Sequence, residues 1–127
     1  MDDVLSAQDL LDAARRRISR FSPDEARAAQ ANGVVIVDLR CEADRVQEGA
    51  IPGAIPIALS VLPWRADPTS ESHDDRIVDS ELILVCNDGF SSSLAAADLL
   101  RMSIRAGDLV GGFRAWATAG LPVDPHP

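Results

Sequence analysis

The 127-residue sequence contains no lysine and only two cysteines, Cys41 and Cys86. Two cysteines cannot build a disulfide framework, and the absence of a Cys-x-x-Cys pair argues against a thiol–disulfide oxidoreductase. This use of cysteine predicts a reducing, cytoplasmic setting. All twelve basic residues are arginine, which together with the abundant alanine indicates a GC-rich, bacterial genome.

Positive charge is also scarce, because twelve basic residues face twenty acidic ones and give a net charge of −8. Such a field repels phosphate backbones and anionic lipids, so neither nucleic acid nor a membrane surface is an expected partner. No apolar run approaches the roughly 20 residues of a membrane span, and Met1-Asp2-Asp3 does not resemble a signal peptide. Two histidines do not form a metal-binding group, so no metal and no other cofactor is expected.

What is present is an ordinary globular composition, 46% hydrophobic and 25% charged, over a length that suits one core. Residues 34–37 and 82–85 are continuously apolar, which is typical of strands buried on both faces. Shorter strands are expected at 54–59 and 109–110, with a polar loop at 67–76. The spacing of apolar residues predicts helices at 5–19 and 91–102. The capping Ser22 with Pro23 predicts one at 23–31, Gly120 ends one at 113–119, and a polar segment predicts a short one ending near 47. This alternation predicts an α/β fold, an open parallel β-sheet with helices on both faces.

Cys86 follows the predicted strand 82–85 at the carboxyl edge of the sheet, where open parallel sheets bind ligands. Gly89 permits the positive φ of a tight turn, which would direct backbone N–H groups and a helix N-terminus at the sulfur. The helix end favours a thiolate, whereas Asp88 opposes it by a comparable amount. From the residues alone, Cys86 is either a nucleophile or a small apolar residue that ends a buried strand.

Over residues 22–123 the chain resembles a single-domain rhodanese, a sulfurtransferase module. Five pieces in the family's order carry the resemblance: VVIVDLR at 34–40, GAIPGA at 49–54, LVCNDGFSS at 84–92, VGGFRAW at 110–116 and GLPV at 120–123. We therefore expect an N-terminal helical extension at 1–21, a rhodanese-like domain at 22–123 and a C-terminal tail at 124–127. The extension is expected to cover the sheet or to support a homodimer.

The resemblance implies a two-step reaction in which Cys86 accepts a sulfane sulfur from thiosulfate or an organic persulfide. A thiol, cyanide or a protein acceptor then removes the sulfur from the Cys86 persulfide. Covalent transfer of this kind suits a lone cysteine among N–H donors. The resemblance assigns the persulfide cradle to the backbone of Asn87, Asp88, Gly89, Phe90, Ser91 and Ser92.

The loop departs from the family pattern because it has no cation. Asn87 and Ser91 occupy positions where thiosulfate-type loops usually carry Arg or Lys, and Ala50 replaces a histidine. A loop with a net negative charge receives a dianion poorly, so weak activity on thiosulfate and better use of a larger persulfide donor are expected. Arg65 is the candidate to replace the missing charge. Asp38 and Arg40 are expected to support the site as an internal pair.

Three further hypotheses concern this site, and the sequence argues against the first. A dual-specificity phosphatase of the same architecture needs an arginine after Cys-x₅, where this chain has Ser92, and no residue from 87 to 93 is basic. A non-enzymatic rhodanese-like module that binds a partner or senses sulfur or oxidant is the principal alternative function. Finally, Cys41 is predicted on the same sheet edge as Cys86, which raises the hypothesis that it resolves a Cys86 persulfide or sulfenate through a disulfide.

Overall fold

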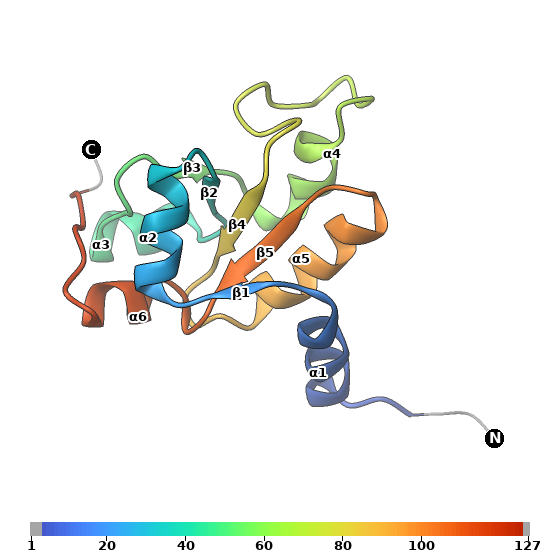
Figure 1. The fold of residues 1–127 in the computed structure, drawn as a ribbon, viewed down its shortest axis with the longest axis horizontal. Coiled ribbons are helices and arrows are strands. Elements are labelled where there is room, and N and C mark those ends of the chain that lie inside the picture. Colours follow the sequence, from blue (N-terminus) through green and yellow to red (C-terminus); the bar gives the residue numbers. More distant parts are fainter. Residues whose placement is uncertain (1–3, 126–127) are drawn as a thin grey trace.

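The computed structural model describes residues 4–125, which form one parallel sheet with helices packed on it (Figure 1). The sheet has five strands in the order β1-β5-β4-β2-β3, and every neighbouring pair is parallel. The strands are β1 (Arg20–Phe21), β2 (Val35–Asp38), β3 (Ile55–Pro56), β4 (Leu82–Val85) and β5 (Ala106–Leu109). The helices are α1 (Ala7–Arg17), α2 (Pro23–Ala31), α3 (Glu42–Glu48), α4 (Leu62–Ala66), α5 (Ser91–Arg101) and α6 (Gly112–Thr118), with a 3₁₀ turn η1 (Leu59–Val61).

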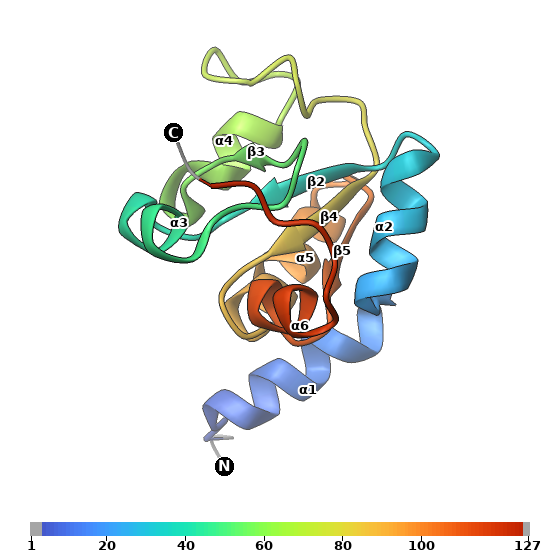
Figure 2. The ribbon, with the colours of Figure 1, turned by 90° about the vertical axis from the view of Figure 1, so that its left-hand side faces the viewer.

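Helices cover both faces of the sheet, which confirms the predicted fold class (Figure 2). On the central strand β4, Leu82 and Leu84 pack with residues of α4 and α5, whereas Ile83 and Val85 pack with residues of α2 and α6. All four β4 side chains are fully buried because successive residues of a strand point to opposite faces. Within residues 4–125, no helix is long and apolar enough to cross a membrane.

The predicted strand 54–59 is much shorter in the structure, where β3 contains only Ile55 and Pro56. Pro56 has no backbone N–H for a further ladder bond, so this strand lies at the edge of the sheet. The chain then turns through η1 into α4, which has a proline in its first turn. Neither η1 nor α4 was predicted, because both are too short to show a helical spacing of apolar residues.

The strand predicted at 109–110 begins earlier, as β5, and pairs with an unpredicted edge strand, β1. Gly107 in β5 makes this pairing sterically feasible, because a Cβ atom there would collide with the Ser19 carbonyl oxygen. A glycine inside a strand commonly marks such a close backbone approach. The next residue, Asp108, is completely buried.

Helix α1 packs mainly on α5 (Figure 1). Its first turn is closed by a capping box in which Ser6 and Asp9 bond each other's backbone N–H groups. Leu11 and Ala14 are buried, while Leu10 remains half exposed. Part of the apolar face predicted for this helix is therefore buried against the rest of the chain.

Candidate functional site

Cys86 lies immediately after β4, and the loop 87–90 connects it to α5. Only 7% of the residue is exposed. Its Sγ atom accepts hydrogen bonds from the N–H of Gly89 at 3.2 Å and from the N–H of Ser92, in the first turn of α5, at 3.4 Å. Gly89 has a φ of +87°, which allows the loop to curl around the sulfur. Two backbone donors and a helix N-terminus thus converge on one thiol.

The loop is held from behind by the start of α6. The N–H of Phe113 donates to the Cys86 carbonyl at 2.9 Å, and the N–H of Arg114 donates to the Asn87 carbonyl at 3.2 Å. In a trans peptide the N–H points away from the preceding carbonyl, so the N–H groups of Asn87 and Asp88 turn to the other side of the loop. The α6 contacts therefore orient the cradle as well as anchor it.

The pKa of Cys86 is lowered from its ordinary value. Burial raises the pKa of this thiol, but hydrogen bonds from the Ser92 and Ser91 hydroxyls and from the Ser92 and Gly89 N–H groups outweigh burial. In the thiol form the S–H donates to Ser92 Oγ at 3.2 Å. After ionisation the same hydroxyl can turn its proton to the sulfur. The surroundings favour a thiolate nucleophile.

Sequence reasoning missed the polar group beneath the loop. The buried Asp108 carboxylate accepts hydrogen bonds from Ser92 Oγ at 2.8 Å and Ser93 Oγ at 2.7 Å. Arg20 pairs with the other carboxylate oxygen at 2.8 Å. An aspartate between apolar neighbours in a short strand, opposite a Ser-Ser-Ser helix start, was the available signal. The strand expected at 109–110 did not include Asp108, because β5 lacks a continuous apolar run.

The sulfur faces a cavity of about 400 Å³. The carboxylates of Asp44 and Asp88 lie on its wall, and the Asn87 side chain donates to Asp44 at 3.1 Å. Hydrogen bonds from Cys41 and Asn87 lower the pKa of Asp44, which keeps it ionised near neutral pH. The complete lining is Leu39, Arg40, Cys41, Asp44, Cys86, Asn87, Asp88, Phe90 and Ser91.

The arginine beside this cavity is engaged in internal contacts. Arg40 is 4% exposed and donates to Asp38 at 2.8 Å and to the Gly49 carbonyl at 2.8 Å, with its guanidinium 3.7 Å from the Phe113 ring centroid. Asp38 pairs in register with Val85, so this ion pair forms a corner beside the cysteine loop. Arg65 is not brought to the cavity: its guanidinium donates to the Ser72 carbonyl at 2.8 Å.

Cys41 lines the same cavity as Cys86, and its side chain is exposed. Its S–H donates to an oxygen of Asp44 at 3.3 Å. The polar neighbour of Cys41 is thus a carboxylate, whereas those of Cys86 are N–H donors. The two cysteines share a wall of the site but have opposite electrostatic surroundings.

An apolar hollow adjoins the cysteine cavity. It has a volume of about 360 Å³ and lies between α1 and α5, and its lining includes Phe90, Ser91 and Leu94. Phe90, with 62% exposure, borders both the hollow and the Cys86 cavity. A molecule bound at the cysteine can therefore extend onto an apolar surface.

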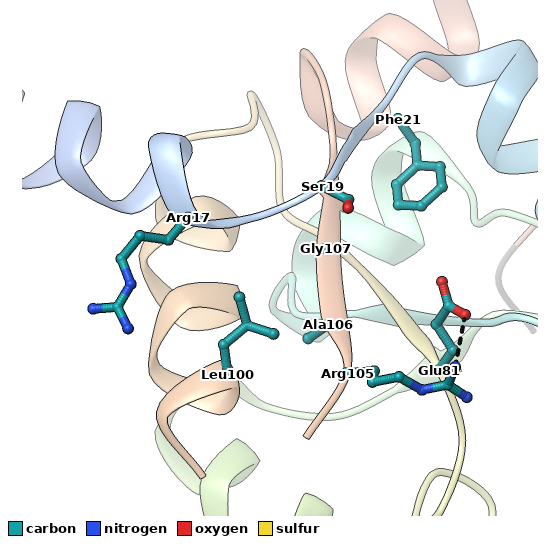
Figure 3. A pocket seen from close by; sticks show the side chains of 8 residues that line it. All are labelled: Arg17, Ser19, Phe21, Glu81, Leu100, Arg105, Ala106 and Gly107. Atoms are coloured by element: carbon teal, nitrogen blue, oxygen red, sulfur yellow. Dashed lines mark ion pairs between the residues drawn. The ribbon is translucent and has the colours of Figure 1, made fainter. Parts of the chain in front are cut away.

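A separate hollow of about 310 Å³ lies near the amino ends of β4 and β5 (Figure 3). It contains the Glu81–Arg105 ion pair, at 3.6 Å, and has no cysteine in its lining. Because Cys86 follows the carboxyl end of β4, this hollow is remote from the cysteine loop. Among residues 4–125, no group of three or more His, Cys, Asp or Glu side chains is arranged to hold a metal ion.

A cradled cysteine at the carboxyl edge of an open parallel sheet defines the class as a cysteine-loop α/β protein. The family model for the Rhodanese-like domain matches residues 22–119, so the chain belongs to the rhodanese-like family. It is 34% identical to a sulfurtransferase of Allochromatium vinosum over 98 residues, 76% of this chain and 84% of the relative. This relationship places it with a family of sulfurtransferases.

Two solved structures extend the comparison. A Rhodopseudomonas palustris protein of unknown function, described as a possible tyrosine phosphatase, is 29% identical with a TM-score of 0.86, covering 98% of this chain and 99% of that protein. A rhodanese-related protein of Thermoplasma volcanium shares the fold with 21% identity and a TM-score of 0.67, covering 85% of this chain and all of the other.

Proposed function

We propose that this protein transfers sulfane sulfur through a persulfide on Cys86. The Cys86 thiolate attacks the outer sulfur of a donor persulfide R–S–SH, forming Cys86–S–SH and releasing the thiolate R–S⁻. An acceptor thiolate then attacks the outer sulfur, takes it as its own persulfide and returns Cys86 to the thiolate. The N–H groups of Gly89 and Ser92, 3.2 and 3.4 Å from Sγ, are the observation that carries this proposal.

The cradle suits both anions that Cys86 forms in this cycle, the thiolate and the persulfide. The oriented N–H groups of Asn87 and Asp88 are available to the outer sulfur, while those of Gly89 and Ser92 serve the inner one. Fixed donors directed at a developing anion lower the barrier because they need no reorganisation during the reaction. Asp38 and Arg40 support the arrangement from the neighbouring strand.

The cavity favours an organic persulfide over thiosulfate. Thiosulfate is a dianion, and it would approach the carboxylates of Asp44 and Asp88. Arg114 forms an ion pair with Asp88 at 2.9 Å and another with Glu48 at 3.3 Å, so its single positive charge is shared between two carboxylates. A persulfide carries less charge, and its organic part can rest on Phe90 and the apolar hollow. We therefore expect low activity with thiosulfate and faster transfer from a larger persulfide, in a reducing, cytoplasmic setting.

The test is the intact mass of the protein after incubation with thiosulfate or with glutathione persulfide. The expected result is a gain of one sulfur atom, reversed by cyanide, with faster loading from glutathione persulfide. Cys86→Ser should not load, whereas the matched variant Cys41→Ser retains the Cys86 nucleophile and should load. Small thiols and protein thiols can then be compared as acceptors by following loss of the added mass.

Failure of both donors to load Cys86 would overturn the enzyme proposal and favour a rhodanese-like module that binds a partner or senses sulfur or oxidant. A phosphatase is not favoured by the loop, since Ser92 stands where the phosphate-clamping arginine would be needed. Moreover, Ser92 is buried and has no positive charge to stabilise the oxygens of an incoming phosphate.

A further inference from the structure

Two arginines from the N-terminal segment reach the back of the cysteine loop. Arg15 of α1 donates to the Gly89 carbonyl at 2.8 Å, and Arg20 of β1 donates to the same oxygen at 3.2 Å. Both residues lie outside the segment 22–119 that the family model matches. The loop that lacks a cation of its own is thus contacted by two cations from another part of the chain.

These contacts fix the orientation of one more peptide in the cradle. The peptide between Gly89 and Phe90 is trans, so a carbonyl held toward the arginines turns the Phe90 N–H to the opposite side of the loop. Within residues 4–125 this N–H has no backbone or side-chain acceptor. The Phe90 N–H therefore joins the N–H groups of Asn87 and Asp88, which the α6 contacts orient, as a third donor of the cradle.

Arg15 and Arg20 also control the hydroxyl next to the sulfur. Arg20 bonds both oxygens of Asp108, at 2.8 and 3.3 Å, and Arg15 donates to Ser93 Oγ at 3.1 Å. Asp108 therefore keeps Arg20 and Ser93 as partners when Ser92 turns its single proton to the Cys86 thiolate. Without Arg20 the buried carboxylate would compete strongly for that proton.

The charge balance beneath the loop follows from the same contacts. Two guanidinium groups face one carboxylate, Asp108, which leaves one net positive charge behind a loop whose own side chains carry only the negative Asp88. The site is largely buried, so screening by solvent is weak there. A persulfide anion on Cys86 would gain from this charge without contacting either arginine.

We propose that Arg15 and Arg20 are positioning residues for sulfur transfer, replacing from behind the loop the cation that its sequence lacks. The inference rests on the proposed sulfur chemistry of Cys86 but concerns residues in the N-terminal segment. The arginines act through the Gly89 carbonyl and through Asp108, Ser92 and Ser93. They touch neither the sulfur nor the donor.

Arg15→Gln is the decisive variant, because Arg15 is half buried and its loss leaves the Arg20–Asp108 pair intact. Arg16→Gln is its matched control: Arg16 lies on the same helix, is exposed, and makes no side-chain hydrogen bond among residues 4–125. Arg15→Lys keeps the charge and one donor for the Gly89 carbonyl. Arg20→Gln is less suitable, since it would leave a buried carboxylate without its counterion.

The measurement is the rate of alkylation of Cys86 by iodoacetamide from pH 5 to 10, followed by mass spectrometry of the Cys86 peptide. Arg15→Gln should slow alkylation at pH 7 by about three- to tenfold and move the inflection to higher pH. Arg16→Gln should match the wild type, and Arg15→Lys should recover most of the rate. Thermal unfolding of each variant is measured alongside.

A wild-type alkylation profile in Arg15→Gln, with or without a lower melting temperature, would overturn the inference and leave Arg15 as an anchor of α1. Equal slowing by Arg16→Gln would also overturn it, since that result would indicate a general charge effect. Alkylation requires no sulfur donor, so its outcome is independent of whether wild-type Cys86 loads sulfur. Failure of this inference and failure of the proposed function are thereby distinguishable.

Discussion

Gly112 packs against the carbonyl group of Cys86 so closely that a Cβ atom on Gly112 would lie 2.5 Å from the Cys86 oxygen. Its φ of +66° is also in the left-handed region that favours glycine. The turn into α6 therefore fixes the position of the cysteine loop, because the next residue, Phe113, donates its N–H to the same carbonyl.

Gly112→Ala should therefore both destabilise the protein and displace the loop. Strain at a positive φ together with a backbone collision is expected to lower the free energy of unfolding by about 2–4 kcal/mol. Loading of Cys86 should fall by more than the unfolded fraction explains. Gly120→Ala is the matched control, because Gly120 has a φ of +77° with no atom near its missing Cβ, and should cost only about 1 kcal/mol. Denaturant unfolding and intact mass test this, and equal losses in both variants would contradict it.

Ser92→Ala should reduce the reactivity of Cys86 by removing the hydroxyl that stabilises its thiolate. Loss of one hydrogen bond worth about 1 kcal/mol corresponds to roughly fivefold slower loading at pH 7. Ser93→Ala removes a comparable bond to Asp108 without touching the sulfur, so it should have the smaller effect. Initial rates with a persulfide donor measure both. The explanation fails if Ser93→Ala slows loading as much as Ser92→Ala.

The rate of loading should depend on pH through the ionisation of Cys86. The folded protein lowers the pKa of this thiol, so the rate should rise with an inflection below that of a free thiol such as glutathione. For the same reason the thiolate favours the folded state above the unfolded pKa, and this stabilisation is lost as pH falls through the folded pKa. Alkylation rates and unfolding free energies across pH test both statements. An inflection at or above that of glutathione would contradict them.

Phe90→Ala should weaken binding of a donor with an apolar organic part. We expect the KM for hexyl persulfide to rise about fivefold, the equivalent of about 1 kcal/mol of lost apolar burial, with little change for thiosulfate. Trp64→Ala is the control, because Trp64 is an exposed aromatic of α4 outside the cysteine cavity. Steady-state kinetics with both donors decide the matter, and a parallel rise for thiosulfate would argue against an organic subsite at Phe90.

The added sulfur should reside on Cys86 and not on Cys41. N–H and hydroxyl donors lower the pKa of Cys86 and favour its thiolate, whereas the side chain of Cys41 contacts the Asp44 carboxylate. Peptide mapping after loading should place the extra mass only on the Cys86 peptide. The same mapping after mild peroxide tests the hypothesis of a resolving Cys41: a peptide linking the two cysteines would support it, and sulfur found on Cys41 would contradict the electrostatic argument.

Local sequence was sufficient for the main elements of this fold. The continuous apolar runs predicted β4 with its correct bounds and β2 within one residue, because a strand buried on both faces has no polar position. The capping Ser22 with Pro23 at the start of α2 and the apolar spacing in α5 likewise predicted those helices. The cysteine at the end of β4 and the glycine three residues later then identified the loop that surrounds the sulfur.

The surroundings of that loop were decided only by the tertiary structure. Asp108 in β5 and the arginines of the N-terminal segment are 15 to 78 residues from their partners in the loop and α5, and no local pattern connects them. Arg65 was expected to supply charge but bonds a nearby carbonyl, whereas Arg15 and Arg20 reach Gly89 because α1 packs on α5 and β1 pairs with β5. Short-range periodicity determines which segments form strands and helices. Which distant charges meet beneath a cysteine depends on how those segments pack, and a single sequence does not encode that in any local pattern.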